Sequence, residues 1–192
     1  MPLRNCALRR TRPVAARPSQ RWLAVTSRLC GLLCALTVAM AGCEAQEGQV
    51  IQVFDGDSLR LHESGGAEVE VRLFGIDAPE RHQPWSNRSR QALHRLVRGQ
   101  SLRLVTVTED RYGRIVATAF RVNDGLDINA EMVREGHAWV YRRYTDDPAL
   151  IRLEEQARQA GRGLWGLPAA DRVPPWQWRR GNRGRGEGET GG

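Results

Sequence analysis

The feature that most constrains the fold is a series of short alternating apolar segments, each ended by turn residues. Between residues 50 and 74, three such runs are separated by Asp55-Gly56-Asp57 and by Gly65-Gly66. Asp-Gly and Gly-Gly pairs between alternating runs are typical of β-hairpins. The pattern therefore predicts three consecutive antiparallel strands. We expect them at residues 50–54, 58–62 and 69–74.

Further along the chain, the spacing between apolar residues changes to the spacing typical of helices. In residues 85–98 the apolar positions fall on one helical face, with Ser86 as the expected N-cap and Gly99 at the end. The same criteria predict two more strands, at 101–107 and 115–122, and two more helices, at 128–135 and 149–160. This order predicts an α+β, mainly β fold, a five-stranded OB-fold Greek-key barrel with three helices.

Charge and cysteine are distributed unevenly. Of 29 basic and 22 acidic residues, seven arginines and no acidic residue precede residue 44, so the remainder is formally neutral. The basic net charge is therefore no evidence for nucleic-acid binding, which has to be argued from local sites. All four cysteines also lie in this first stretch, which excludes a disulfide framework or a thiolate metal site in the rest of the chain.

The first 43 residues are interpreted as a signal peptide. An apolar run from Leu29 to Gly42 follows an arginine-rich stretch; it is shorter than the roughly 20 residues of a membrane span and fits a secretory signal. Ala39-Met40-Ala41 allows ordinary cleavage, whereas Met40–Cys43 resembles a lipobox that would attach Cys43 to a membrane lipid. An uncleaved signal anchor is the third alternative. We expect an exported protein in the periplasm, in the envelope or outside the cell.

The remaining chain is expected to form one domain and a tail. Residues 44–178 have the length of a single domain. Residues 174–178, Pro-Pro-Trp-Gln-Trp, are expected to fold back over an apolar face. Residues 179–192 are rich in glycine and charge and hold no apolar side chain, so they are expected to be disordered.

Polar groups gather where the predicted strands end. They are Asp55-Gly56-Asp57, Arg72, Asp77-Ala78-Pro79-Glu80 and the segment 110–114, Asp-Arg-Tyr-Gly-Arg. Each motif alone is adequately explained as a turn. With their flanking residues these motifs form three blocks, at 53–61, 71–81 and 110–114. Together with a fourth block at 129–139 they resemble, in order, the staphylococcal nuclease-like (thermonuclease) family. The resemblance covers about residues 48–168.

This resemblance implies an OB-fold phosphodiesterase that uses Ca²⁺. Asp57 and Asp77 would ligate the metal through their carboxylates and Ala78 through its backbone carbonyl, with Asp55 behind them. The family often has threonine in place of Ala78, so a hydroxyl hydrogen bond is lost while a backbone ligand survives. The expected catalytic residues are Arg72 and Arg114, gripping the phosphate, and Glu80 as general base. The expected substrate-binding residues are Arg111, Tyr112, Tyr141 and Tyr144.

The chemistry of these residue types agrees with that implication. Ca²⁺ prefers hard oxygen ligands, and two carboxylates with a carbonyl leave an open site. Guanidinium groups offer paired N–H donors to the charge that develops on a phosphoryl group, and a carboxylate can accept the proton of attacking water. The four histidines show no metal-ligand spacing and are interpreted as ordinary surface or packing residues.

The sequence thus favours an exported, Ca²⁺-dependent, sugar-nonspecific nuclease, expected to be a monomer, that cleaves DNA and RNA to 3′-phosphate products. The alternative is a noncatalytic OB-fold module that binds nucleic acid or an envelope partner. A binding module has no need for two metal-ligating aspartates, two arginines and a general base, so retention of the whole set favours the enzyme.

Overall fold

The computed structural model describes residues 46–186, and side chains as far as residue 181. The described residues all lie in one compact unit, Ala45–Gly192. The expected signal peptide, Cys43 and the last six residues lie outside the described residues. Within the described part, no helix has the length and apolar character needed to cross a membrane.

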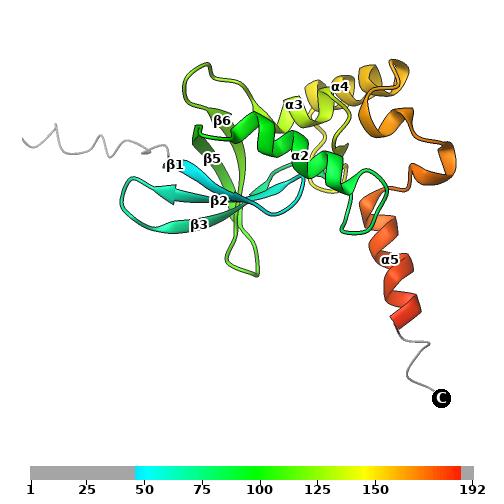
Figure 1. Ribbon diagram of the computed structural model, residues 1–192, viewed down its shortest axis with the longest axis horizontal. Helices are drawn as coiled ribbons and strands as arrows, with labels where there is room; N and C mark the ends of the chain where they lie inside the picture. The colour runs from blue at the N-terminus through cyan, green and yellow to red at the C-terminus, as the bar shows by residue number, and fades with distance from the viewer. Residues whose placement is uncertain (1–45, 187–192) are drawn as a thin grey trace, which may run out of the picture. The chain divides into compact units, whose positions relative to one another are not determined.

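Five strands form a closed barrel in the order β1-β2-β3-β6-β5 (Figure 1). Neighbouring strands are antiparallel except for β3 and β6, which pair in parallel with Arg72 opposite Val116. This confirms the predicted OB-type barrel. The strands are β1 (Gln46–Val53), β2 (Ser58–Glu63), β3 (Glu68–Leu73), β5 (Ser101–Glu109) and β6 (Ile115–Arg121).

Alternation along the strands separates the core from the functional face. On β3, Val71 and Leu73 are fully buried in the barrel, whereas Arg72 between them lies outside it. On β2, Leu59 and Leu61 are buried in the same way. Successive side chains of a strand point to opposite faces, so burial of the apolar set fixes the direction of Arg72.

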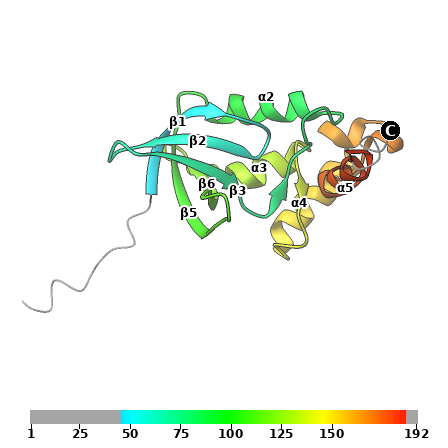
Figure 2. The ribbon, with the colours of Figure 1, turned by 90° about the horizontal axis from the view of Figure 1, so that it is seen from below.

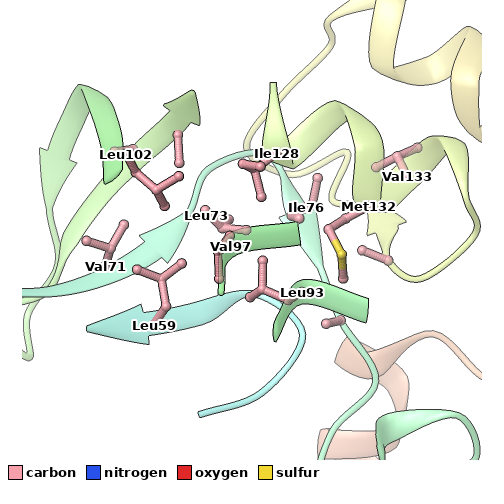
Figure 3. Close-up of a cluster of buried hydrophobic side chains, with 14 of the residues drawn as sticks. Leu59, Val71, Leu73, Ile76, Leu93, Val97, Leu102, Ile128, Met132 and Val133 are labelled. Carbon is pink, nitrogen blue, oxygen red and sulfur yellow. The ribbon is translucent and has the colours of Figure 1, made fainter. Parts of the chain in front are cut away.

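Two helices close the main core. Figure 3 shows Leu93 and Val97 of α2 (Ser86–Val97) and Met132 of α3 (Ile128–Arg134) with the apolar side chains of the strands. The side chain of Asp127 caps α3 by accepting from the backbone N–H of Ala130 at 2.9 Å. Ser86 was expected to cap α2, but it is the first helical residue. The preceding Trp85 is the cap, in a left-handed conformation with φ of 74°.

A second apolar cluster adjoins α4 (Pro148–Gln159) and consists of buried Trp139, Ala157, Leu164 and Trp165. Trp176, in the segment expected to fold back, packs against it. Trp139 belongs to β7 (Trp139–Val140), which pairs with β4 (Ile76–Asp77). These two-residue strands and the short helices at Gly163–Gly166 and Ala169–Asp171 were not predicted.

The C-terminal end differs from the expectation of a disordered tail beginning at residue 179. Helix α5 spans Pro175–Gly186 and extends away from the barrel (Figure 1), and Figure 2 shows the same helix nearly end-on. Including α5, the described chain has four α-helices where three were predicted. Pro175 supplies the physical reason, because proline at the first helical position has a backbone already suited to a helix start.

Candidate active site

One open pocket of about 740 Å³ collects every site residue that the sequence predicts. Its walls come from the β1–β2 turn, β3, β4 with the segment after it, the β5–β6 loop, the segment after β7, and α5. The predicted residues lining it are Asp55, Asp57, Arg72, Asp77, Ala78, Glu80, Arg111, Tyr112, Arg114, Tyr141 and Tyr144. The polar motifs, which run from Asp55 to Arg114 in the sequence, therefore meet in space.

The turn that carries Asp55 and Asp57 is fixed by close contacts on both sides of Gly56. A Cβ atom at this position would lie 1.8 Å from Ser89 Oγ of α2 and 2.8 Å from the Cβ of Ala78. Glycine is therefore required for the turn to pack this tightly against the helix. Within the turn, the N–H of Asp57 donates to Oδ1 of Asp55 at 2.9 Å.

Asp57 and Asp77 are both buried, with 5% and 1% of their surface exposed. Oδ2 of Asp57 accepts a hydrogen bond from the backbone N–H of Ala78 at 2.5 Å. Nη2 of Arg72 lies 3.1 Å from Oδ2 of Asp57 and 3.1 Å from Oδ1 of Asp77. The two carboxylates are thus close enough to share one cation.

Burial and repulsion from the neighbouring Asp57 raise the pKa values of Asp55 and Asp77. Burial, reinforced by the negative charge of Asp57, raises the pKa of Asp55 to about 7. Burial also raises the pKa of Asp77 to about 6, with Asp57 adding to the rise while Arg179 and Arg72 oppose it. The nearby arginines therefore do not fully offset the effect of burial, which disfavours the charged form of both acids.

Glu80 lies on the segment after β4 and is half-exposed. Its backbone N–H donates to Oε1 of Gln83 at 2.9 Å, and the amide of Gln83 in turn donates to the carbonyl of Val173 at 2.5 Å. The Glu80 carboxylate forms an ion pair with Arg179. Gln83 therefore connects the segment bearing Glu80 to the chain entering α5.

The β5–β6 loop holds Arg114 through Asp110. Oδ2 of Asp110 accepts from Nε of Arg114 at 2.8 Å and lies 2.8 Å from its Nη2. Oδ1 of Asp110 accepts from the N–H groups of Tyr112 and Arg114 at 2.9 and 3.1 Å. Although burial acts to raise it, these hydrogen bonds leave the pKa of Asp110 below its ordinary value.

The tyrosines that line the pocket differ in how much of each ring is exposed to solvent. Tyr112 is 69% exposed and has the Arg111 guanidinium carbon 4.8 Å above its ring centre. Tyr144 is also exposed, and its ring lies at 80° to that of Tyr141 with 4.8 Å between the ring centres. One face of Tyr141 is covered by Trp176, whose ring is parallel to it within 3° at 5.2 Å.

Arg179 is the site residue that the sequence did not reveal. It lines the pocket and pairs with Asp77 and Glu80, both predicted to act in the site. The composition of residues 179–192 indicated a tail. The available signal was the spacing of Trp176 and Arg179, which places them on one side of a helix starting at Pro175.

Comparison with known proteins agrees with this geometry. The model of the family described as "Staphylococcal nuclease homologue" matches residues 70–166. An "Uncharacterized endonuclease" of Escherichia coli is 43% identical over 137 residues, 71% of this chain and 87% of that protein. A "Micrococcal nuclease" of Shigella flexneri is 37% identical over 71% of this chain and 82% of its own length.

A plant protein that matches over part of its length gives a third comparison. "Probable staphylococcal-like nuclease CAN1" of Oryza sativa subsp. japonica is 34% identical over 77% of this chain but only 45% of its own length. The two bacterial relatives match over most of their length, 87% and 82%. The chain therefore belongs to the staphylococcal nuclease-like family and is a nuclease that hydrolyses phosphodiester bonds.

Proposed function

We propose that this nuclease is exported, requires Ca²⁺, and cuts both DNA and RNA to leave 3′-phosphate ends. The observation that carries the proposal is the sharing of one Arg72 nitrogen by Asp57 and Asp77, at 3.1 Å from each, in a pocket that also holds Glu80 and Arg114. Two buried carboxylates, two guanidiniums and a half-exposed carboxylate are the groups that phosphodiester hydrolysis needs.

The donor set fits a hard divalent cation. Asp57 and Asp77, with the backbone carbonyl of Ala78, would hold it through oxygen alone. Residues 46–186 contain no group of three or more His, Cys, Asp or Glu side chains arranged to hold a metal, so the proposed site has few protein ligands. When bound, the metal would supply positive charge for the phosphate oxygens and orient the substrate.

The two arginines would bind and stabilise the phosphate. Arg72 is now paired with Asp57 and Asp77, and Arg114 with Asp110. A phosphate entering the pocket would offer each guanidinium a second acceptor for its paired N–H groups. Because charge on the phosphoryl oxygens increases during attack, these contacts would strengthen toward the transition state.

Glu80 would accept the proton of the attacking water. Its half-exposed carboxylate is accessible from the pocket, and its position is fixed by the hydrogen bond from its N–H to Gln83. Exposed rings of Tyr112 and Tyr144 line the same pocket and can stack on any base, which supports cleavage without a preference for one base.

Export rests on the sequence alone, through the arginine-rich stretch and the apolar run of residues 29–42. A calcium site with few protein ligands needs the higher free Ca²⁺ found outside cells. Cell fractionation with mass analysis of the N-terminus tests this part. A mature terminus near Gly42 or Cys43 supports export, a lipid on Cys43 supports anchoring, and an intact Met1 on a soluble cytoplasmic protein contradicts it.

The activity is tested with the full chain on plasmid DNA and on single-stranded RNA, first with Ca²⁺ and then with excess EGTA. Both substrates should be cut only with Ca²⁺, and the fragments should need phosphatase treatment before a polymerase can extend them. Glu80→Gln should lower turnover by about 10²-fold or more. Glu155→Gln, a change at an exposed acid on α4, should not. Wild-type turnover in Glu80→Gln, or full cleavage in EGTA, would contradict the proposal.

A further inference from the structure

The guanidinium of Arg179 occupies the acidic side of the pocket. Its Nη2 lies 2.8 Å from Oδ2 of Asp77, and its Nη1 donates to Oδ1 of Asp77 at 3.2 Å. The same Nη1 also pairs with the carboxylate of Glu80. One side chain therefore binds both oxygens of a proposed metal ligand and an oxygen of the proposed general base.

The first turn of α5 holds Arg179 in this place. Trp176 stacks on Tyr141 and lies at 77° to the ring of Trp139, with 5.9 Å between those two ring centres. The carbonyl of Val173, just before the helix, accepts a hydrogen bond from Gln83. Arg179 follows Trp176 by three residues and so lies on the same side of the helix. A group tethered in this way acts at a high effective concentration on the carboxylates beside it.

Arg72 and Arg179 differ in how readily they can leave Asp77. Arg72 extends from the barrel strand β3, has 17% of its side chain exposed, and also donates to the carbonyl of Leu73 at 2.8 Å. Arg179 extends from a helix outside the barrel and has 35% exposed. A movement of the Arg179 side chain would therefore leave the barrel strands unchanged, whereas a movement of Arg72 would not.

A divalent cation on Asp77 and the Arg179 guanidinium would need the same oxygens. Both are cations that bind carboxylate oxygen, and the bidentate pair with Arg179 uses both oxygens of Asp77. We propose that Arg179 is an internal cation that occupies Asp77 and Glu80 until a divalent metal displaces it, and that it thereby weakens metal binding and sets the metal concentration at which Glu80 is released. This inference rests on the calcium site of the proposed function.

Calorimetric titration of the full chain with CaCl₂ alone, without substrate, tests the inference. Arg179→Gln removes the competing charge, so we expect its dissociation constant for Ca²⁺ to fall by at least about fivefold, given the strength of charge-assisted hydrogen bonds. Arg179→Lys keeps one charge without the planar fork and should be intermediate. Arg180→Gln is the matched control, because Arg180 is the exposed neighbour on the same helix, and it should bind Ca²⁺ as wild type does.

Thermal unfolding gives a second measurement that does not depend on activity. In EGTA, Arg179→Gln should melt below wild type, because Asp77 and Glu80 lose a partner. In saturating Ca²⁺ the two proteins should melt together, which also shows that the variant folds. Equal calcium affinity in all the variants would overturn the role of Arg179 and leave the calcium nuclease standing. Absence of calcium binding in every protein, wild type included, would overturn both.

Discussion

Replacing Gly56 by alanine should destabilise the protein and disturb the acidic turn. The new Cβ would lie 1.8 Å from Ser89 Oγ, 2.8 Å from Ala78 Cβ and 2.9 Å from Ser89 Cβ. Such overpacking costs about 1–3 kcal/mol. Rotation of Ser89 away from the new methyl group would also break the 2.7 Å hydrogen bond from its hydroxyl to the carbonyl of His137, which costs about 0.5–1.5 kcal/mol.

The expected loss for Gly56→Ala is therefore about 2–4 kcal/mol, or about 5–15 °C in melting temperature for a domain of this size. Urea and thermal unfolding monitored by circular dichroism measure it. Gly65→Ala is the matched control, because Gly65 also lies in a hairpin turn but has open space around its Cβ position. It should be neutral or slightly stabilising.

Ser89→Ala tests the cause of the effect. This change removes the hydroxyl that lies nearest to the new methyl group but leaves the contacts at 2.8 and 2.9 Å. The double variant should therefore be more stable than the sum of the two single losses predicts. A Gly56→Ala protein within about 0.5 kcal/mol of wild type, or strict additivity in the double variant, would refute the reasoning.

Three further predictions concern the site. Arg72→Lys and Arg114→Lys should each lower kcat/KM severely in plasmid cleavage, because an ammonium group lacks the planar fork that meets a phosphate at two atoms; wild-type rates in both would remove the arginines from the mechanism. Cleavage should require Ca²⁺ at high micromolar to millimolar levels, with Zn²⁺ unable to replace it because the pocket offers hard oxygen ligands; cleavage by the EGTA-treated protein after adding Zn²⁺ alone would contradict this. Burial raises the pKa of Asp55 from 3.8 to about 7, so the folded state keeps a proton that the unfolded state releases, and this group lowers stability as pH rises from about 4 to 7. Asp55→Asn keeps the oxygen that accepts the N–H of Asp57 but cannot titrate. The stability of this variant relative to wild type, measured by urea unfolding in EGTA, should therefore increase between about pH 4 and pH 7. A constant difference in stability would show that Asp55 does not titrate there.

The barrel was predictable because its strands carry their signal locally. Leu59 and Leu61 alternate with Arg60, and Val71 and Leu73 alternate with Arg72, so the period of two alone distinguishes the inner face from the outer one. Asp127 and Gly136 mark the start and the end of α3 in the same local way. Such signals need no knowledge of distant partners.

The unpredicted parts depend on partners far along the chain. β4 and β7 have two residues each and exist because Asp77 pairs with Trp139, a contact that no local pattern records. Arg179 meets Asp77 across 102 residues, and its neighbours in sequence are the glycine and charge of a tail. Pro175 begins α5, and tertiary packing of Trp176 against Trp139 and Tyr141 stabilises it. This packing outweighs the weak helical preference of its later glycines.

The parallel pairing of β3 with β6 also links assembly of the phosphate-binding site to closure of the barrel. This pairing places Arg72 opposite Val116, just beyond Arg114, after the chain has passed through α2 and β5. Contacts that close long loops form slowly, because the chain loses entropy before it gains the contact. Arg72 and Arg114 are therefore expected to come together only when β3 and β6 pair, so phosphate binding by both arginines should appear with closure of the barrel.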